Sequence, residues 1–187
     1  MIKAVIFDCF GVLVTDGWLP FKEHYFGTDN TLRTQATELN ALTDAGVRSY
    51  DDFLTGIAKL AGISKAEAQQ QISSNVPNEQ LLNFVATLKP SYKIGILSNA
   101  GANFLSTFFS SEQLQLFDAI CLSYQTGFIK PAPQAYVDIA KKLNVPLEAC
   151  VFVDDQARFC TSAQEVGMQT VHYKNFDQFQ AGFTSLV

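Results

Sequence analysis

The stretch KAVIFD at residues 3–8 decides the fold, because it is apolar almost without interruption and stops at an aspartate. Four more runs of this kind follow along the chain: YKIGILS at 92–98, DAICLS at 118–123, ACVFVD at 149–154 and QTVHY at 169–173. Such continuous runs are typical of strands that helices cover on both faces, as in a parallel sheet. Helical patterns lie between them at 101–110, 133–143 and 158–167, and Gly167 ends the last. The alternation predicts an α/β fold with a doubly wound parallel sheet.

One connection is too long for a simple crossover, since residues 9–91 separate the first run from the second. Helical patterns fill it: TLRTQATELNALTDAG at 31–46, SYDDFLTGIAKLAG at 49–62, SKAEAQQQISSN at 64–75 and NEQLLNFVATLK at 78–89. Ser49 is suited to begin the second of these helices, with Asp52 three residues on. We therefore expect an α-helical subdomain at 15–77, inserted into a core formed by 1–14 and 78–187. The end of the chain, 176–187, predicts a short amphipathic helix.

The composition is that of a globular protein, with 187 residues of which 48% are hydrophobic and 17% charged. A net charge of -5 argues against a nucleic-acid partner, which requires a basic face. The first residues, MIKAVIFDCF, are too short an apolar run for a signal or a membrane span. We expect a cytoplasmic monomer or small homo-oligomer without a membrane partner. The cysteines at 9, 121, 150 and 160 form no CxxC pair and predict reduced core thiols.

Polar residues stand where the apolar runs stop. These are Asp8 after the first run, Ser98 and Asn99 after the second, Lys130 in the loop GFIKPAP after the third, and Asp154 and Asp155 after the fourth. In an open parallel sheet, ligands bind outside the carboxyl ends of the strands, so these side chains are expected to converge on one edge. Taken singly, a strand-end aspartate is as often a helix cap, and a lone lysine is usually solvated.

Together these residues predict a magnesium site. Three carboxylates at one edge repel one another and raise their pKa values unless a cation joins them, and Lys130 offsets only one charge. Mg²⁺ prefers such oxygen ligands beside a substrate phosphate. With the charge neutralised, Asp8 can attack phosphorus and form an aspartyl phosphate, which water then hydrolyses. Ser98 and nearby backbone N–H groups are candidates to hold the phosphoryl oxygens of a small phosphorylated substrate.

Four blocks occur in a characteristic order: FDCFGVL at 7–13, ILSNA at 96–100, KPAPQAY at 130–136 and VFVDD at 151–155. Through them the chain resembles the haloacid dehalogenase (HAD) superfamily. The resemblance implies a Rossmann-like core with a small helical cap of the C1 type inserted after the first strand, and an active site between the two. It also implies a hydrolase, which we interpret as a Mg²⁺-dependent phosphatase.

The same resemblance implies a role for each strand-end residue. Asp8 is the nucleophile and Lys130 bridges it to the substrate. Ser98 binds phosphate, and Asn99 either bonds the substrate or fixes its loop. The metal ligands are Asp8, the Phe10 backbone carbonyl and Asp155, with Asp154 supporting them.

The chain departs from the family pattern at Phe10. Members usually carry a second aspartate two residues after the nucleophile, which protonates the leaving group and then activates water. A benzyl side chain does neither, and loss of a general acid–base typically costs about 10²–10⁴ in rate. The first interpretation is a phosphatase whose leaving group needs little help, or in which another acid substitutes. Asp16 and His24 are the nearest candidates, although either is more often a surface residue.

Two alternatives remain open. A 2-haloacid dehalogenase resembles the chain in its aromatic at position 10, but such enzymes work without metal, carry neutral residues at Asp154 and Asp155, and use a cap arginine that neither Arg33 nor Arg48 matches. A phosphate-binding protein with weakened chemistry is supported by Phe10, and by Phe159 in place of a common asparagine. The intact Asp8, Lys130 and Asp155 argue against it.

The expected cap offers further candidates. Four of its aromatic residues, Trp18, Phe21, Tyr25 and Phe26, line a substrate pocket or, more commonly at such spacing, form a core. The segment DAGVRSYDDF at 44–53 resembles a cap loop whose polar side chains face the active site. Asp44 and Arg48 are therefore candidates to contact the substrate, although an exposed ion pair is the commoner fate of such an arginine. Cys9 is expected to face the core.

Overall fold

The computed structural model describes residues 1–187 and contains one parallel sheet of five strands in the order β3-β2-β1-β4-β5. The strands are β1 (Ala4–Phe7), β2 (Lys93–Ser98), β3 (Ala119–Leu122), β4 (Cys150–Asp154) and β5 (Gln169–His172). All five follow the apolar runs of the sequence, and the α/β fold is confirmed. The residues of β1 have no exposed surface, because β1 is central and helices cover both of its faces.

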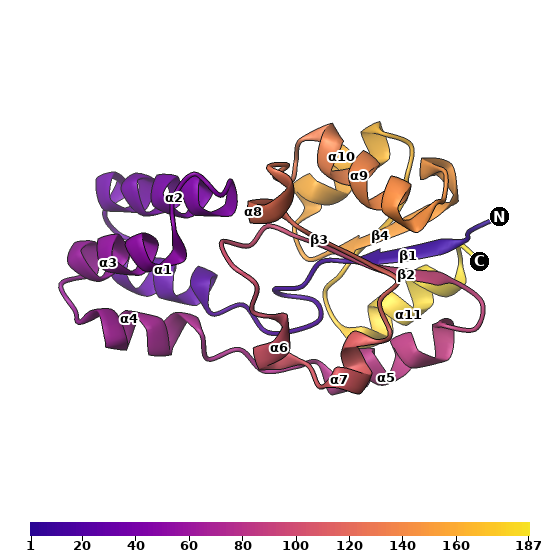
Figure 1. The fold of residues 1–187 in the computed structure, drawn as a ribbon, viewed down its shortest axis with the longest axis horizontal. Coiled ribbons are helices and arrows are strands. Elements are labelled where there is room, and N and C mark those ends of the chain that lie inside the picture. Colours follow the sequence, from indigo (N-terminus) through magenta and orange to yellow (C-terminus); the bar gives the residue numbers. More distant parts are fainter.

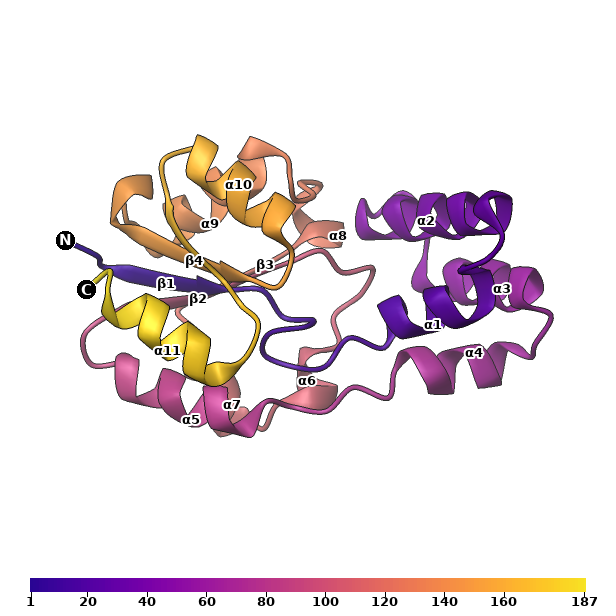
Figure 2. The ribbon, with the colours of Figure 1, turned by 180° about the vertical axis from the view of Figure 1, so that it is seen from behind.

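Helices cover the sheet on both sides (Figures 1 and 2). On one face lie α5 (Glu79–Leu88) and α11 (Phe176–Thr184), and on the other α9 (Pro133–Leu143) and α10 (Ala157–Glu165). Short elements connect them: α6 (Leu105–Phe108), α7 (Ser111–Leu114), α8 (Ser123–Thr126) and the 3₁₀ turn η1 (Leu147–Ala149). The predicted helices at 133–143 and at the carboxyl terminus are therefore present.

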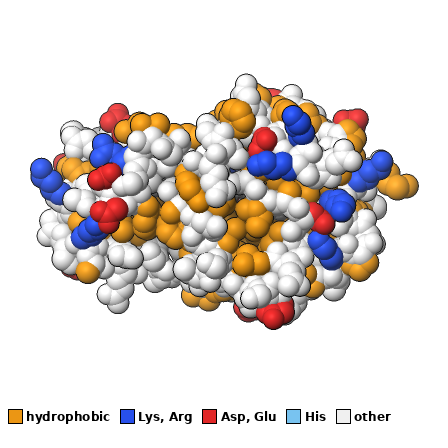
Figure 3. Space-filling model, in the orientation of Figure 1, with side chains coloured by type: hydrophobic (Ala, Val, Ile, Leu, Met, Phe, Trp, Pro, Cys, Tyr) orange, Lys and Arg blue, Asp and Glu red, His pale blue; other side chains and the backbone are white.

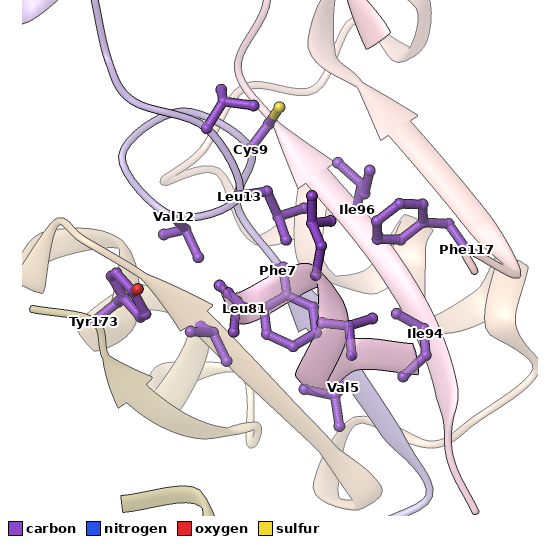
Figure 4. Packing of buried hydrophobic residues seen from close by; sticks show 14 of the residues in the cluster. Val5, Phe7, Cys9, Val12, Leu13, Leu81, Ile94, Ile96, Phe117 and Tyr173 are labelled. Atoms are coloured by element: carbon purple, nitrogen blue, oxygen red, sulfur yellow. The ribbon is translucent and has the colours of Figure 1, made fainter. Parts of the chain in front are cut away.

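Each face of the sheet has its own hydrophobic core, because successive side chains of a strand point to opposite faces. Val5 and Phe7 pack in the cluster that includes α5 and α11, shown in Figure 4. Ala4 and Ile6 pack in the cluster that includes α9 and α10. Full burial of a side chain of this size contributes about 1.5–3 kcal/mol, so the two cores hold β1 and its last residues rigidly.

Four helices lie together beside the carboxyl edge of the sheet and form what we call the helical unit (Figures 1 and 2). They are α1 (Trp18–Phe26), α2 (Asn30–Asp44), α3 (Tyr50–Ala61) and α4 (Lys65–Ile72). The unit has a separate core of nine buried residues, among them Phe26, Phe53 and Ile57. The Ser49 side chain caps α3 by accepting a hydrogen bond from the Asp52 N–H at 3.1 Å. The chain enters and leaves the unit through adjacent segments, where the Thr15 N–H donates to the Val76 carbonyl at 2.9 Å.

The helix predicted at 101–110 is wrong in its extent. Only Leu105–Phe108 and Ser111–Leu114 are helical. Asn103 begins the first of these turns by accepting from the Leu105 N–H at 3.1 Å, and Phe109 is extended, so the helix stops there. Residues 101–104 form a loop because Gly101 packs against the helical unit instead of covering the sheet.

The four cysteines are buried and unpaired, as predicted, and Cys9 lies in the core beside α5. No helix combines the length and the apolar character that a membrane crossing requires.

Candidate active site

Three carboxylates lie together at the carboxyl edge of the sheet. Asp8 directly follows β1, and Asp154 is the last residue of the neighbouring strand β4, in register one step beyond the Phe7–Val153 pair. Asp155 follows at once, and oxygens of all three carboxylates lie within 4.8 Å of one another. Asp8 and Asp154 are buried, so their charges are weakly screened.

The Lys130 ammonium lies between two of these carboxylates. Its Nζ is 2.9 Å from Asp8 Oδ1 and 2.7 Å from Asp154 Oδ2, and the residue is only 2% exposed. The ammonium also lies 4.9 Å from the centre of the Phe159 ring, a favourable cation–π distance. Burial lowers the pKa of Lys130, but the two carboxylates outweigh it and raise the pKa, so the side chain stays protonated.

Asn99 holds the Lys130 loop in place. Its Oδ1 accepts from the Lys130 backbone N–H at 2.8 Å, and its Nδ2 donates to the Lys130 carbonyl at 3.0 Å. Both ends of the amide are thus engaged with the same residue. Of the two roles open to Asn99, these contacts favour fixing the loop over bonding a substrate through the side chain.

The cluster carries more negative charge than Lys130 neutralises. Burial raises the pKa of Asp8 well above its ordinary range, and the Asp154 and Asp155 charges add to this against the attraction of Lys130. Burial and then the Asp154 charge raise the pKa of Asp155 to about 6. Carboxylates held in this way favour the arrival of a further cation.

The oxygens of the cluster fit a magnesium ion. Asp155 Oδ1 is buried and has no hydrogen-bond partner, and the Phe10 carbonyl oxygen accepts no hydrogen bond from the protein. The loop approaches Asp155 closely because residue 11 is glycine at a φ of +81°, where a Cβ atom would lie 2.7 Å from the Asp155 carboxyl carbon. His172 Nε2 lies 2.8 Å from the Asp155 carbonyl and orients the residue. Unpaired oxygens of carboxylates and carbonyls are the donors that Mg²⁺ takes in proteins.

Two further oxygens at the sheet edge, one of Asp8 and one of Ser98, make no hydrogen bond with the protein. Asp8 Oδ1 accepts a hydrogen bond from the Cys9 N–H at 2.7 Å and forms an ion pair with Lys130 Nζ at 2.9 Å, whereas Oδ2 makes no hydrogen bond. Ser98, the last residue of β2, has a buried hydroxyl without a partner. An unsatisfied buried group of this kind costs about 1–3 kcal/mol, which a bound oxyanion recovers.

A cavity of about 190 Å³ separates the sheet edge from the helical unit. Asp8, Lys130 and Phe10 line one side, and Asp16 and Asp44 line the other. Aromatic side chains form much of the remaining wall: Trp18, Tyr50, Phe53, Phe104 and Phe108. Figure 3 shows hydrophobic side chains near the middle of the molecule, where the helical unit meets the sheet, and few charged ones there.

Phe10 belongs to the apolar part of this wall. Its ring meets the Phe108 ring edge to face, with 6.0 Å between centres. The cavity is therefore partly apolar beside Asp8, and residue 10 supplies no proton there.

Some of the cap residues that the sequence offered as candidates line the cavity, and others do not. Trp18 lines the cavity, whereas Phe21 and Phe26 are buried in the core of the helical unit. Asp44 lines the cavity and Arg48 does not. His24 is exposed and lies outside the cavity, which removes it as a substitute acid.

The polar face of α2 that contains Asp44 was not predicted from the sequence. Thr37 and Asn40 line the cavity together with Asp44 from one side of this helix. Their spacing of three and four residues places them on one face, a signal that the sequence contains. Phe104 and Phe108 were also missed, because 101–110 was assigned to a helix packed on the sheet.

The chain matches the family model described as haloacid dehalogenase-like hydrolase over residues 2–167. It is 28% identical to a D-ribitol-5-phosphate phosphatase from Bacteroides thetaiotaomicron, over 94% of this chain and 93% of that protein. It is 27% identical to a sesquiterpene phosphatase from Aspergillus oryzae, over 91% of this chain and 89% of that protein.

Solved structures show the same fold. A HAD family enzyme from Bacteroides thetaiotaomicron superposes with a TM-score of 0.77 at 21% identity, covering 97% of this chain and 98% of that one. Its complex with magnesium and inorganic phosphate superposes with a TM-score of 0.70 at 23% identity, covering 93% of this chain and 95% of that one.

Proposed function

The chain belongs to the haloacid dehalogenase-like hydrolases, and on that basis we propose that it is a Mg²⁺-dependent phosphatase that hydrolyses a small phosphorylated metabolite through an aspartyl phosphate at Asp8. One observation carries the proposal: the buried Asp8 carboxylate lies against Lys130 and within 4.8 Å of the Asp154 and Asp155 oxygens. This set of charges suits a phosphate dianion, which an anionic nucleophile approaches only when cations neutralise it.

The roles of the individual residues follow from their contacts. The Cys9 N–H and Lys130 hold Asp8 Oδ1, so Oδ2 is the oxygen available to attack phosphorus. Ser98 donates its free hydroxyl to a phosphoryl oxygen. Lys130 remains charged and bridges nucleophile and phosphate, while Asn99 keeps its backbone in place.

Asp8, the Phe10 carbonyl and Asp155 would hold the Mg²⁺, with Asp154 behind them. Bound there, the ion supplies the charge neutralisation that phosphoryl transfer requires. The solved complex of the Bacteroides enzyme with magnesium and inorganic phosphate supports this assignment.

The helical unit acts as a cap in this proposal, with residues 15–77 as cap and 1–14 and 78–187 as core. The cavity between them receives the substrate. One phosphatase relative is named for a sugar alcohol phosphate, D-ribitol 5-phosphate, and the other is named as a sesquiterpene phosphatase. A cavity with both a polar helix face and aromatic walls suits a small organic phosphate. In this proposal the protein acts as a monomer or small homo-oligomer in the cytoplasm.

Two other functions make different demands on the site. A 2-haloacid dehalogenase brings a substrate carboxylate, which the charges of Asp154 and Asp155 would repel. A phosphate-binding protein without turnover has no need for the buried Asp8 carboxylate, whose charge opposes the binding of phosphate.

The test is a screen of phosphorylated metabolites, acyl phosphates and 2-haloacids, with Mg²⁺ and with chelator. We expect Mg²⁺-dependent phosphate release that Asp8→Asn abolishes and the exposed control Asp177→Asn retains. Phosphate release that persists in Asp8→Asn contradicts the proposal. Halide release that survives the chelator supports the dehalogenase, and phosphate binding without any turnover supports the binding protein.

A further inference from the structure

The floor of the cavity lacks a free acid for the leaving group. An alkoxide leaves phosphorus readily only when a positioned acid protonates it. Lys130 is held between Asp8 and Asp154, and its raised pKa makes it a poor donor. Phe10 presents only its ring. A proton donor for this reaction therefore has to come from the opposite wall.

The carboxyl-terminal end of α2 forms that wall and contacts the loops of the sheet directly. A Cβ atom on Gly101 would lie 2.3 Å from Thr43 Cγ2, and one on Gly46 would lie 2.7 Å from the Tyr124 carbonyl oxygen. At such close contacts, α2 cannot shift along these loops without steric overlap. The contacts fix Asp44, the last residue of α2, over the loop that begins at Asn99 and on the same cavity as Asp8 and Lys130.

The Asp44 carboxyl group has one oxygen free. Its Oδ2 accepts from Asn40 Nδ2 at 2.8 Å, and its Oδ1 makes no hydrogen bond with the protein. No lysine or arginine forms an ion pair with it. The side chain is thus oriented by one contact and open at the other atom.

Asp16, the other carboxyl group on this wall, is bound through one oxygen to the backbone of α1. Its Oδ1 accepts from the Trp18 N–H at 2.7 Å and from the Leu19 N–H at 3.3 Å, which caps the first turn of α1. Burial raises the pKa of Asp16, and these two backbone hydrogen bonds oppose that rise by favouring the ionised form. Asp16 therefore has a structural role that Asp44 lacks.

We propose that Asp44 is the general acid–base of this site, donating a proton from Oδ1 to the leaving-group oxygen. The inference rests on the proposed phosphatase function. Burial raises the pKa of Asp44 to about 7, against the Asn40 hydrogen bond and the Lys130 charge and with a smaller contribution from the Asp16 charge. Both protonation states are then populated near neutral pH, as a group that gives and takes a proton requires.

The two half-reactions balance. In the first, Asp8 Oδ2 forms a bond to phosphorus, the bond from phosphorus to the leaving oxygen breaks, and that oxygen takes the Asp44 proton and departs as an alcohol. In the second, the Asp44 carboxylate takes a proton from water as the water oxygen bonds to phosphorus. The bond to Asp8 breaks, phosphate leaves, and Asp44 is protonated again.

The experiment compares wild type with Asp44→Asn on aryl phosphates, from p-nitrophenyl phosphate to phenyl phosphate, and on benzyl phosphate, with Mg²⁺ present. The nitrophenolate ion leaves without a proton, whereas the benzyl alkoxide does not. We expect kcat/KM, which reports the first half-reaction alone, to fall by about 10²–10⁴ on benzyl phosphate and by less than about 10-fold on p-nitrophenyl phosphate. The amide of Asn can still accept from Asn40, so the local structure is retained.

Equal losses of kcat/KM on all substrates, or no loss of kcat/KM on benzyl phosphate, overturn the role of Asp44. The matched control is Asp16→Asn, which is expected to change all substrates alike. Wild type provides an independent readout, because kcat/KM on benzyl phosphate should fall above pH 7 while kcat/KM on p-nitrophenyl phosphate does not, and parallel profiles overturn the inference. Failure of the phosphatase function itself is recognised separately, as turnover that Asp8→Asn leaves intact.

Discussion

Lys130 is a fully buried cation whose stability depends on its two carboxylate partners. A buried ion pair is strongly destabilised when one partner is removed, because the other charge stays buried without compensation. This separates Lys130 from the half-exposed Lys142, whose Nζ lies 3.0 Å from Asp138 Oδ2. Exposed pairs of the latter kind contribute about 0–1 kcal/mol.

Lys130→Met is therefore expected to lower the free energy of unfolding by about 3–5 kcal/mol at pH 8 without Mg²⁺. Lys142→Met is the control and is expected to lose less than about 1 kcal/mol. Urea denaturation measures both. Similar losses for the two variants would show that the removal of Lys130 does not leave its carboxylate partners as uncompensated buried charges.

The raised pKa of Asp44 makes stability depend on pH. The unfolded chain releases this proton near pH 4, whereas the folded protein keeps it up to about pH 7. The folded state thus binds the proton more tightly, and stability falls as pH rises across this window.

Without Mg²⁺, wild type should lose up to about 4 kcal/mol more than Asp44→Asn between pH 4 and pH 8, since three pKa units correspond to that free energy. Urea titrations of both proteins at the two pH values measure the difference. Identical pH dependence would mean that Asp44 titrates normally in the folded state.

The strand-end rule identifies Asp8, Ser98 and Asp155 from sequence, because each directly follows or ends an apolar run. The same rule is silent about Asp44. Its place on the cavity depends on how α2 meets Gly101 and Tyr124, contacts between residues far apart in the chain. The partner of the Asn99 amide was hidden for the same reason.

At the scale of elements, the contact between α2 and the loop after β2 sets the cavity. Thr43 is only 2% exposed, and its Oγ1 donates to the Leu39 carbonyl at 2.8 Å, which fixes the rotamer that points Cγ2 at Gly101. Thr43 therefore cannot easily move aside for a larger side chain at position 101.

Gly101→Ala is expected to push α2 away from the loop and lower kcat/KM by about 10-fold or more, since small misplacements cost this much in catalysis. Thr43→Ser removes the methyl group concerned, so the double variant should recover part of the loss. Steady-state kinetics in a double-mutant cycle measures the coupling. Additive losses would contradict a contact between these two residues.

The strands and most helices were predictable, because each apolar run can form a buried strand and each helical pattern can form a helix that covers the sheet. The segment 101–110 was not, because its Phe104 and Phe108 have helical spacing yet face the cavity instead of the sheet. Local periodicity indicates that a face is buried but not which partner buries it.

At the scale of the whole molecule, the carboxylate cluster belongs to the sheet, and the helical unit has its own core. A ligand that binds only the folded sheet stabilises the protein by mass action. Mg²⁺ is expected to raise the free energy of unfolding by about 2.7 kcal/mol at about 100 times its Kd.

Asp155→Asn removes an open ligand oxygen and should abolish most of this stabilisation, whereas Asp138→Asn on α9 should retain it. Thermal unfolding with increasing Mg²⁺ provides the comparison. Equal Mg²⁺ effects in the two variants would place the ion elsewhere on the protein.

Phosphoryl transfer through Asp8 leaves a covalent intermediate on that residue. Acid-quenching the enzyme during turnover of p-nitrophenyl phosphate, followed by mass spectrometry of the phosphorylated peptide, detects it. A hydroxylamine-sensitive phosphoryl group on Asp8, formed with Mg²⁺ and absent without it, is the predicted result. A phosphoryl group on another residue, or full turnover by Asp8→Asn, would contradict the account.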